Sequence, residues 1–161
     1  MKNSNIRGEF MDKKSLILLI VCIIVFSFVV LTYAGIFNQE ETLQVGEINF
    51  KLPEGYKFAG YTEQGYPKIT NGLDSIYFEY YNDTDISKHV KNFTDYCNSK
   101  NRNVTLSNFT TNDISVYKTV TSDHRNNYWF VYGDKTYTFF TWKETFKVDD
   151  LAHYLIDSSI N

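Results

Sequence analysis

A single apolar run near the N-terminus decides which architectures this chain can adopt. Residues 16–37 are 22 positions without a charged side chain, and 16 of them are Leu, Ile, Val or Phe. As a helix, the run reaches about 33 Å, enough to cross a hydrocarbon core of about 30 Å. A helix buried in a soluble core would carry a polar stripe, yet Ser27 and Thr32 are its only hydroxyl residues before Tyr33. The run predicts a transmembrane helix, and it makes the lipid bilayer the partner of residues 16–37.

The flanks of the run predict its orientation. Basic residues precede it, whereas Asn-Gln-Glu-Glu follows it at 38–41. Because Lys and Arg stay on the cytoplasmic side, we expect residues 1–15 to be a cytoplasmic stub of a cell-membrane protein. A cleaved secretory signal is the alternative, with Lys13-Lys14 as its basic region and Thr32-Tyr33-Ala34 as its cleavage site, although such signals have an apolar region of only about 7 to 15 residues. Both interpretations export residues 38–161.

Charge and cysteine content exclude several classes of function. The chain has a net charge of −3, and residues 38–161 hold 12 Lys and Arg against 17 Asp and Glu. We therefore expect no basic surface for nucleic acid. Cys22 and Cys97 lie in segments of different character, so they predict neither a disulfide framework nor a four-ligand zinc site. Whether the chain starts at Met1 or Met11 does not affect these conclusions.

Residues 43–161 predict one extracytoplasmic α+β domain, which follows a polar spacer at 38–42. Apolar alternation with period two indicates strands of an antiparallel sheet, and a period of 3.6 indicates two helices packed with it. Asp85 is the expected N-cap of the first helix, which should end near residues 100–102. The first strand is expected over 43–52, with an interruption at Gly46. Further strands are expected over 57–62, 68–70, 75–81, 104–109 and 114–121. A hairpin over 127–142, which turns at Gly133-Asp134-Lys135, and a second helix over 148–158 complete the domain.

The apolar positions also predict which faces are buried. Both faces of the 127–142 hairpin are apolar, which indicates a central pair of strands covered on both sides. Cys97 is expected to be a small buried apolar side chain. The buried face of the first helix should hold Ile86, Val90, Phe93 and Cys97, and that of the second Leu151, Tyr154, Leu155 and Ser158.

This order of elements resembles the PsbP-like α/β/α sandwich over residues 43–160. The resemblance also rests on the entry Phe50-Lys51-Leu52-Pro53-Glu54-Gly55-Tyr56, the Gly-Asp-Lys turn and the closing helix near Asp157-Ser158-Ser159. It implies a small membrane-anchored protein of a prokaryotic envelope. PsbP-like proteins share a fold more than a task, so the resemblance implies no functional residues, and the anchor departs from the soluble members.

No motif in the sequence predicts catalysis. His89, His124 and His153 have no metal-ligand spacing with another His, Cys or carboxylate, and there is no nucleophile elbow or phosphate loop. The pair Asp149-Asp150 is explained by stabilisation of a helix start. We therefore predict no catalytic residue, no metal and no cofactor.

Two features remain as candidate sites on the exported domain. Asn-x-Ser/Thr acceptor sites for glycosylation occur at Asn82, Asn92, Asn103 and Asn108. Residues 38–161 also contain 12 Tyr, 9 Phe and 2 Trp. Most of these rings are expected in the core. The expected exposed exceptions, which could stack on a sugar or anchor a protein partner, are Tyr61, Tyr66, Tyr80 and Tyr81.

The sequence thus favours a non-catalytic binding or accessory module of the cell envelope, with an envelope protein or a glycan as partner. The alternative is a surface enzyme that acts on wall-derived substrates, which a carboxylate and a histidine in one concave pocket would favour. A third possibility is a subunit that assembles through an uncovered sheet edge. The specific partner and the oligomeric state are left open.

Overall fold

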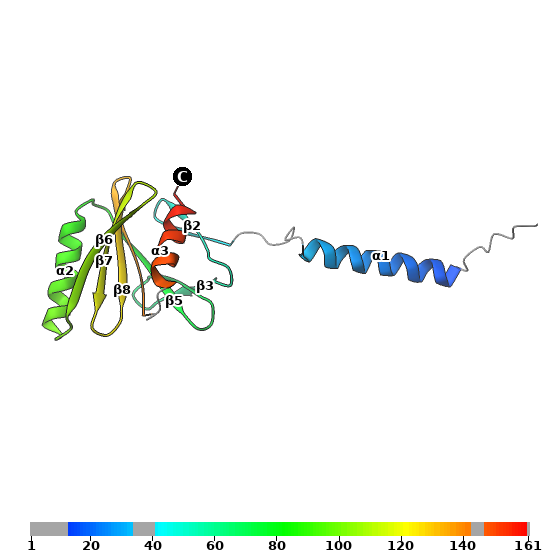
Figure 1. The fold of residues 1–161 in the computed structure, drawn as a ribbon, viewed down its shortest axis with the longest axis horizontal. Coiled ribbons are helices and arrows are strands. Elements are labelled where there is room, and N and C mark those ends of the chain that lie inside the picture. The colour runs from blue at the N-terminus through cyan, green and yellow to red at the C-terminus, as the bar shows by residue number, and fades with distance from the viewer. Residues whose placement is uncertain (1–12, 34–40, 143–146, 161) are drawn as a thin grey trace, which may run out of the picture. The chain divides into compact units, whose positions relative to one another are not determined.

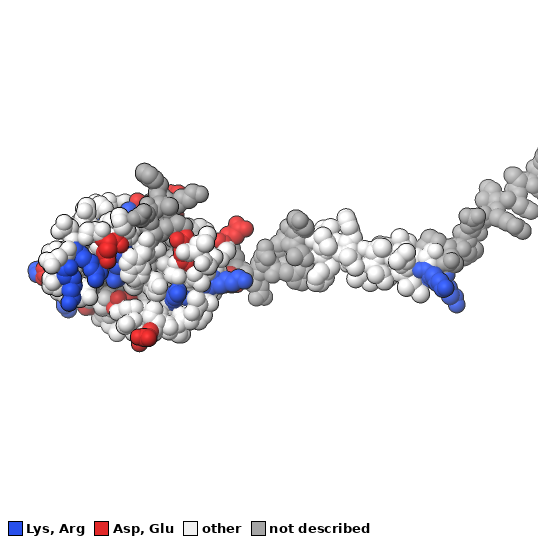
Figure 2. All heavy atoms as spheres, turned by 90° about the horizontal axis from the view of Figure 1, so that it is seen from below, with Lys and Arg blue, Asp and Glu red and all other residues white. Residues whose placement is uncertain are grey.

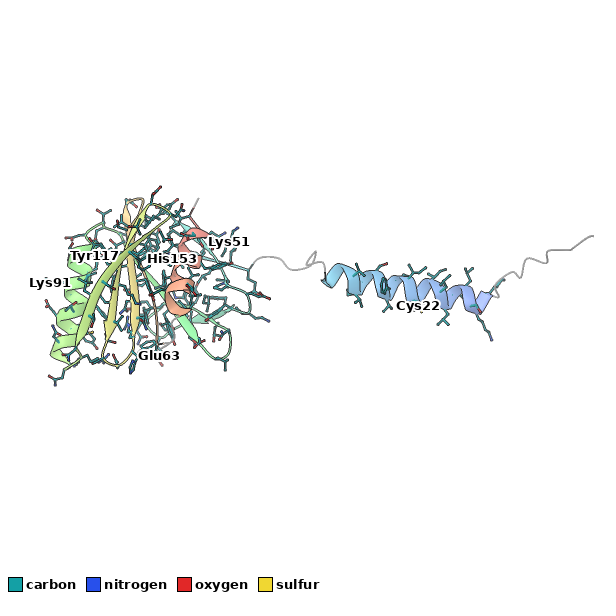
Figure 3. The ribbon with its side chains drawn as sticks, viewed as in Figure 1. Cys22, Lys51, Glu63, Lys91, Tyr117 and His153 are labelled. Atoms are coloured by element: carbon teal, nitrogen blue, oxygen red, sulfur yellow. The ribbon has the colours of Figure 1, made fainter. Side chains whose placement is uncertain are left out.

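The computed structural model describes residues 13–33, 41–142 and 147–160, and the chain divides into two units, Met1–Gln39 and Glu40–Asn161. The first unit contains helix α1 (Lys13–Tyr33). The helix carries its charges at its N-terminal end (Figure 2), and the side chains of residues 13–30, including Cys22 (Figure 3), are all exposed within the unit. By length and composition α1 can cross a membrane. Residues 34–37 of the predicted span lie outside the described residues.

The second unit is an α+β domain, as predicted. Its main sheet has seven antiparallel strands in the order β3-β4-β5-β9-β8-β7-β6, and β1 and β2 form a separate two-stranded sheet (Figure 1). The strands are β1 (Thr42–Val45), β2 (Ile48–Lys51), β3 (Lys57–Tyr61), β4 (Pro67–Thr70), β5 (Ser75–Tyr81), β6 (Val104–Thr111), β7 (Ile114–Thr121), β8 (Asn126–Tyr132) and β9 (Lys135–Thr141).

The predicted hairpin of β8 and β9 is confirmed, and it lies in the interior of the sheet. The two strands pair from Asn126↔Thr141 to Tyr132↔Lys135, so the turn is Gly133-Asp134. Every residue of β8 from Asn126 to Phe130 is buried, and so is every residue of β9 from Thr136 to Thr141. Consecutive strand residues point to opposite faces, so both faces of this pair are covered.

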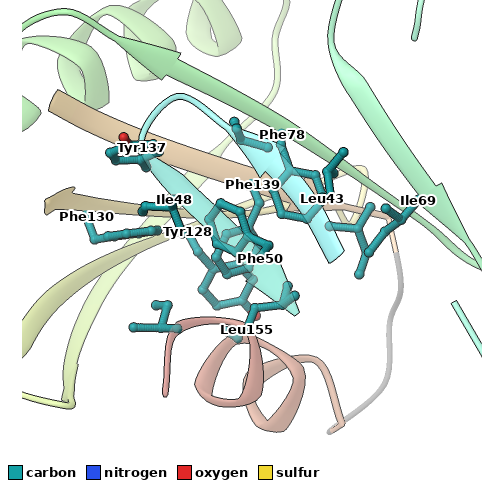
Figure 4. Packing of buried hydrophobic residues seen from close by; sticks show 14 of the residues in the cluster. Leu43, Ile48, Phe50, Ile69, Phe78, Tyr128, Phe130, Tyr137, Phe139 and Leu155 are labelled. Carbon is teal, nitrogen blue, oxygen red and sulfur yellow. The ribbon is translucent and has the colours of Figure 1, made fainter. Parts of the chain in front are cut away.

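One face of the sheet packs against β1, β2 and helix α3 (Lys147–Asp157). Figure 4 shows the β1–β2 hairpin and α3 lying over aromatic side chains of the sheet. This is the main core, and its fully buried large side chains stabilise the fold by removing apolar area from water. They include Phe50 of β2, Phe78 of β5, Tyr128 and Phe130 of β8, Tyr137 and Phe139 of β9, and Leu155 and Ile156 of α3.

The prediction of one interrupted strand over 43–52 is wrong, because the interruption is a hairpin turn. Val45 pairs with Ile48, which leaves Gly46 and Glu47 as a two-residue turn. Gly46 has a φ of 57°, and glycine with positive φ at the first turn position is typical of a type II′ hairpin. The apolar alternation survives the turn, since Leu43, Val45, Ile48 and Phe50 are all buried.

Helix α2 (Ile86–Ser99) covers part of the opposite face, and Asp85 is its N-cap, as predicted. Its predicted buried face is only partly right, because Ile86, Val90 and Phe93 are half-buried and His89 is buried together with Cys97. The Asp85 carboxylate accepts a 3.0 Å hydrogen bond from the Lys88 amide, and Lys91 points away from the sheet (Figure 3). The Cys97 side chain is 1% exposed, which confirms it as a buried residue. Burial raises the pKa of its thiol above the ordinary value, so the thiol stays protonated at neutral pH.

The predicted buried face of α3 is only partly right. Leu155 is fully buried, but Tyr154 is 42% exposed. Ala152, Ile156 and, just after the helix, Ile160 are buried instead. The observed buried face is rotated by about one residue around the helix axis from the predicted one. The apolar pattern resolves such a rotation poorly, because it counts Tyr as apolar although the Tyr hydroxyl favours contact with solvent.

Candidate functional site

The described surface is hollowed where strand β4 ends before its neighbour β5. Strand β4 pairs with β5 only over Ser75–Tyr77. A hollow of about 450 Å³ opens beside the remaining part of β5. A second hollow of about 320 Å³ lies on the α2 side of the sheet. Both are lined by Tyr66 and Glu79, and we call the two hollows together the tyrosine site.

The structure brings all four candidate tyrosines to this site. Tyr61, Tyr66 and Tyr80 line the first hollow, and Tyr66 and Tyr81 line the second. Tyr61 is 68% exposed and Tyr80 is 43% exposed, whereas Tyr66 and Tyr81 are half-buried. Four rings from three segments of the chain therefore line two adjoining hollows, and Tyr66 is common to both.

Glu79 lies beside the two half-buried tyrosines, Tyr66 and Tyr81. It alternates with Tyr77 and Tyr81 along β5, and so faces α2. Burial raises the pKa of both Tyr66 and Tyr81, and the Glu79 carboxylate, which accepts a hydrogen bond from each hydroxyl, raises both values further. Both phenols thus remain protonated donors at neutral pH, and Glu79 is an acceptor at the junction of the two hollows.

Arg125 is the cation of the site, and it lies among aromatic rings. Its guanidinium carbon is 3.7 Å from the centroid of Phe140, 5.0 Å from that of Phe93 and 5.4 Å from that of Trp142. Its Nε donates a 2.7 Å hydrogen bond to Asn127 Oδ1. Burial lowers the pKa of Arg125, but an arginine remains charged at physiological pH.

His89 closes the second hollow at the helix side. Its ring stacks on that of Tyr81 with 3.9 Å between centroids, and its Nε2 lies 2.7 Å from Asp83 Oδ1. This hydrogen bond lowers the pKa of Asp83. His89 is therefore engaged on both sides, and it holds the Tyr81 ring in position.

The other candidate residues are distributed over the surface. Asn82, Asn92, Asn103 and Asn108 are all exposed, and only Asn92 of these four lines the tyrosine site. His124 sits in a turn with a φ of 64°. His153 Nδ1 lies 2.8 Å from Thr111 Oγ1 (Figure 3), and His153 lines neither hollow of the site.

Glu79, Arg125 and Trp129 are site residues that sequence reasoning did not single out. A signal existed for Glu79, which is the one acidic residue in an otherwise aromatic face of β5. Arg125 gave no such signal, because its aromatic neighbours come from α2, β9 and the residue after β9. Only the pairing of β8 with β9 brings it beside Phe140 and Trp142.

No protein-family model matches the sequence, and no curated protein matches it significantly. Across the described parts of the chain, no three His, Cys, Asp or Glu side chains are grouped so that they could hold a metal ion. The chemistry of the tyrosine site must therefore be inferred from its own geometry, which offers aromatic faces, phenol donors, one carboxylate and one guanidinium.

Proposed function

We propose that this protein is a single-pass envelope protein whose outward domain binds another envelope component without catalysing a reaction. The observation that carries the proposal is that Tyr61, Tyr66, Tyr80 and Tyr81 line two hollows that share Tyr66 and Glu79. Tyrosine rings contribute large contact areas at low entropic cost, and they are enriched where proteins bind partners. The proposed partner is an envelope protein or a glycan.

Crosslinking in intact membranes tests this proposal. A photoreactive phenylalanine analogue replaces Tyr61 at the rim of the site or, as a matched control, Tyr154, which is exposed on α3. We expect a crosslinked species with the probe at residue 61 and none with the probe at residue 154. Equal capture at the two positions, or none at either, would contradict binding at the tyrosine site.

The membrane topology belongs to the same proposal. We infer that α1 stays in the membrane, with the N-terminus inside and residues 41–160 outside, because basic residues precede the helix and acidic residues follow it. Protease added to whole cells should then digest the domain. Protection in whole cells and digestion only after lysis would contradict the orientation.

An enzyme that acts on wall-derived substrates remains the second candidate function. It is favoured by the contact of Asp83 with His89 beside the second hollow, since such a pair can act in acid–base catalysis. Against it, the His89 side chain is only 10% exposed and stacks on Tyr81. Turnover of wall-derived substrates by the wild type and not by His89→Gln would favour the enzyme.

Three finer proposals follow from the sequence and remain to be tested. The layers, with α2 and α3 on opposite faces of an antiparallel sheet, support a PsbP-like sandwich. Strand β6 forms an edge of the sheet with mostly exposed residues, which supports assembly through that edge. The exposure of Asn82, Asn92, Asn103 and Asn108 supports glycosylation, and enzymatic deglycosylation of the native protein should then increase its electrophoretic mobility.

A further inference from the structure

The second hollow of the tyrosine site contains an arginine with unused donors. Among the described residues, the only hydrogen-bond partner of the Arg125 guanidinium is Asn127, which accepts from Nε, and no carboxylate lies within ion-pair distance. The rings of Phe140 and Phe93 hold the guanidinium plane in place. Its two terminal nitrogens thus form a preorganised fork, the geometry that binds a carboxylate through two parallel hydrogen bonds.

The carboxylate of Glu79 lines the same hollow as the Arg125 guanidinium. Glu79 interacts with Arg125 electrostatically, but the two side chains form no ion pair. Glu79 is surrounded by hydroxyl donors, the phenols of Tyr66 and Tyr81. A carboxylate has about four acceptor positions, so Glu79 can accept further hydroxyl groups from a ligand that lies between it and Arg125.

Aromatic rings form the rest of the wall. Phe93 and Trp129 lie with their centroids 5.7 Å apart, and Tyr66, Tyr81 and Tyr96 complete the lining. Ring faces of this kind pack against the apolar C–H face of a sugar ring. The hollow, at about 320 Å³, is within the size range of small-molecule sites.

We propose that the tyrosine site binds a carboxylated saccharide. Its carboxylate binds the fork of Arg125, its hydroxyl groups donate to Glu79, and its ring packs on Phe93 and Trp129. This inference rests on the proposed binding function and specifies the ligand. Residues 38–161 hold 17 acidic against 12 basic residues, and this net negative charge repels a densely charged polyanion. The ligand should therefore hold isolated carboxylates among neutral hydroxyl groups.

Tryptophan fluorescence provides a local readout. The chain has two tryptophans: Trp129 lines the second hollow, and Trp142 lies 5.4 Å from the Arg125 guanidinium. The full chain in detergent micelles is titrated with glucuronic acid, N-acetylmuramic acid and a hyaluronan tetrasaccharide, and separately with the methyl esters of the same sugars. We expect at least one acid to bind about tenfold more tightly than its ester, because the ester loses the charge that the guanidinium fork binds.

Variants separate this contact from a general charge effect. Arg125→Gln should weaken binding of the acid by about tenfold and leave binding of the ester unchanged. Arg102→Gln is the matched control, since Arg102 pairs with Asp123 at 3.1 Å and does not line the site, and it should change neither affinity. If Arg125→Gln does not fold, as judged by its urea midpoint, the affinities of the wild type for the acid and for the ester test the carboxylate contact instead.

Two results would overturn the inference. One is equal affinity for acid and ester, and the other is no binding of any of the three acids at millimolar concentration. In either case the crosslinking experiment at residue 61 still decides the proposed function separately: capture there would retain a binding module with a different ligand, and no capture would remove both proposals.

Discussion

The guanidinium of Arg125 lies 3.7 Å from the centre of the Phe140 ring, the shortest of its aromatic contacts. Phe140 is itself buried, stacked on Tyr77 at 5.1 Å and in edge contact with Trp142 at 5.5 Å. One ring thus joins strand β5, strand β9 and the cation of the tyrosine site.

Replacing Phe140 with Leu should therefore affect both stability and the site. We expect a loss of about 1 to 3 kcal/mol in the free energy of unfolding, from lost ring contacts and a small cavity. Urea unfolding in detergent micelles, followed by tryptophan fluorescence, measures it. Phe58→Leu is the control, because Phe58 is exposed and its replacement should change stability by less than about 0.5 kcal/mol. Equal losses for the two variants would show that Phe140 has no special role.

A second prediction concerns the bond between the sheet and helix α3. The buried Tyr128 hydroxyl donates a 2.7 Å hydrogen bond to Asp149 Oδ1, which also accepts one of 2.7 Å from Lys118. Tyr128→Phe and Asp149→Asn should each destabilise the domain by about 1 to 2 kcal/mol, because each removes a hydrogen bond to a charged group. The double variant should lose less than the sum of the two single losses, by about 0.5 kcal/mol or more. Additive losses would mean that the two side chains do not interact.

The same carboxylate predicts how stability depends on pH. Burial alone would raise the pKa of Asp149, but the hydrogen bonds from Lys118 and Tyr128 outweigh it and lower the pKa below its ordinary value. Since the unfolded chain then binds the proton more readily, the contribution of Asp149 is fully present above the ordinary pKa of about 3.9 and is lost as the pH falls through the lower folded value.

Urea unfolding of the wild type and Asp149→Asn at a series of pH values tests this sign. The stability difference between them should be constant from about pH 7 to pH 5 and should shrink below about pH 4. A difference that persists undiminished at about pH 2 would show that the Asp149 pKa is not lowered by folding.

How far the sequence predicts this protein depends on the range of the interactions. Local signals worked: the Asp85 cap places the start of α2, and the Gly133-Asp134 turn places the central hairpin. Turn geometry at Gly46 was missed, because Gly-Glu between two apolar alternations can continue a strand as well as reverse it. The alternation pattern carries no information on direction.

The candidate site shows the same limit more clearly. The four tyrosines were chosen one by one, and nothing in their spacing shows that Tyr61 and Tyr66 meet Tyr80 and Tyr81. Their convergence depends on the early end of β4. Arg125 was missed because its three ring contacts involve residues up to 32 positions away, and only strand pairing and the docking of α2 bring them together.

Helix α1 gives a prediction about the membrane. Ile24 lies near its middle and is exposed within its unit. Ile24→Arg should reduce insertion, because an arginine at the centre of a spanning helix costs about 2.5 to 3.5 kcal/mol on the insertion scale. Carbonate extraction of membranes should then release more of the chain, whereas Ile24→Leu should leave it in the pellet. Unchanged retention of the arginine variant would contradict a spanning α1.

The turn between β1 and β2 gives the last prediction. A Cβ added at Gly46 would lie 2.8 Å from the Tyr137 hydroxyl oxygen. Tyr137 cannot move aside easily, since it is buried, its ring stacks on Phe130 at 5.6 Å, and its hydroxyl accepts a 3.0 Å hydrogen bond from the Glu47 amide.

Gly46→Ala should therefore cost about 2 to 4 kcal/mol, from positive-φ strain together with the steric clash. Gly72→Ala is the matched control, because Gly72 also has a positive φ but its Cβ would meet nothing within 4 Å. It should cost only the backbone strain, about 1 to 2 kcal/mol. Urea unfolding of both variants measures the difference, and similar losses would mean that the hairpin turn can shift away from Tyr137 without disturbing the core beneath it.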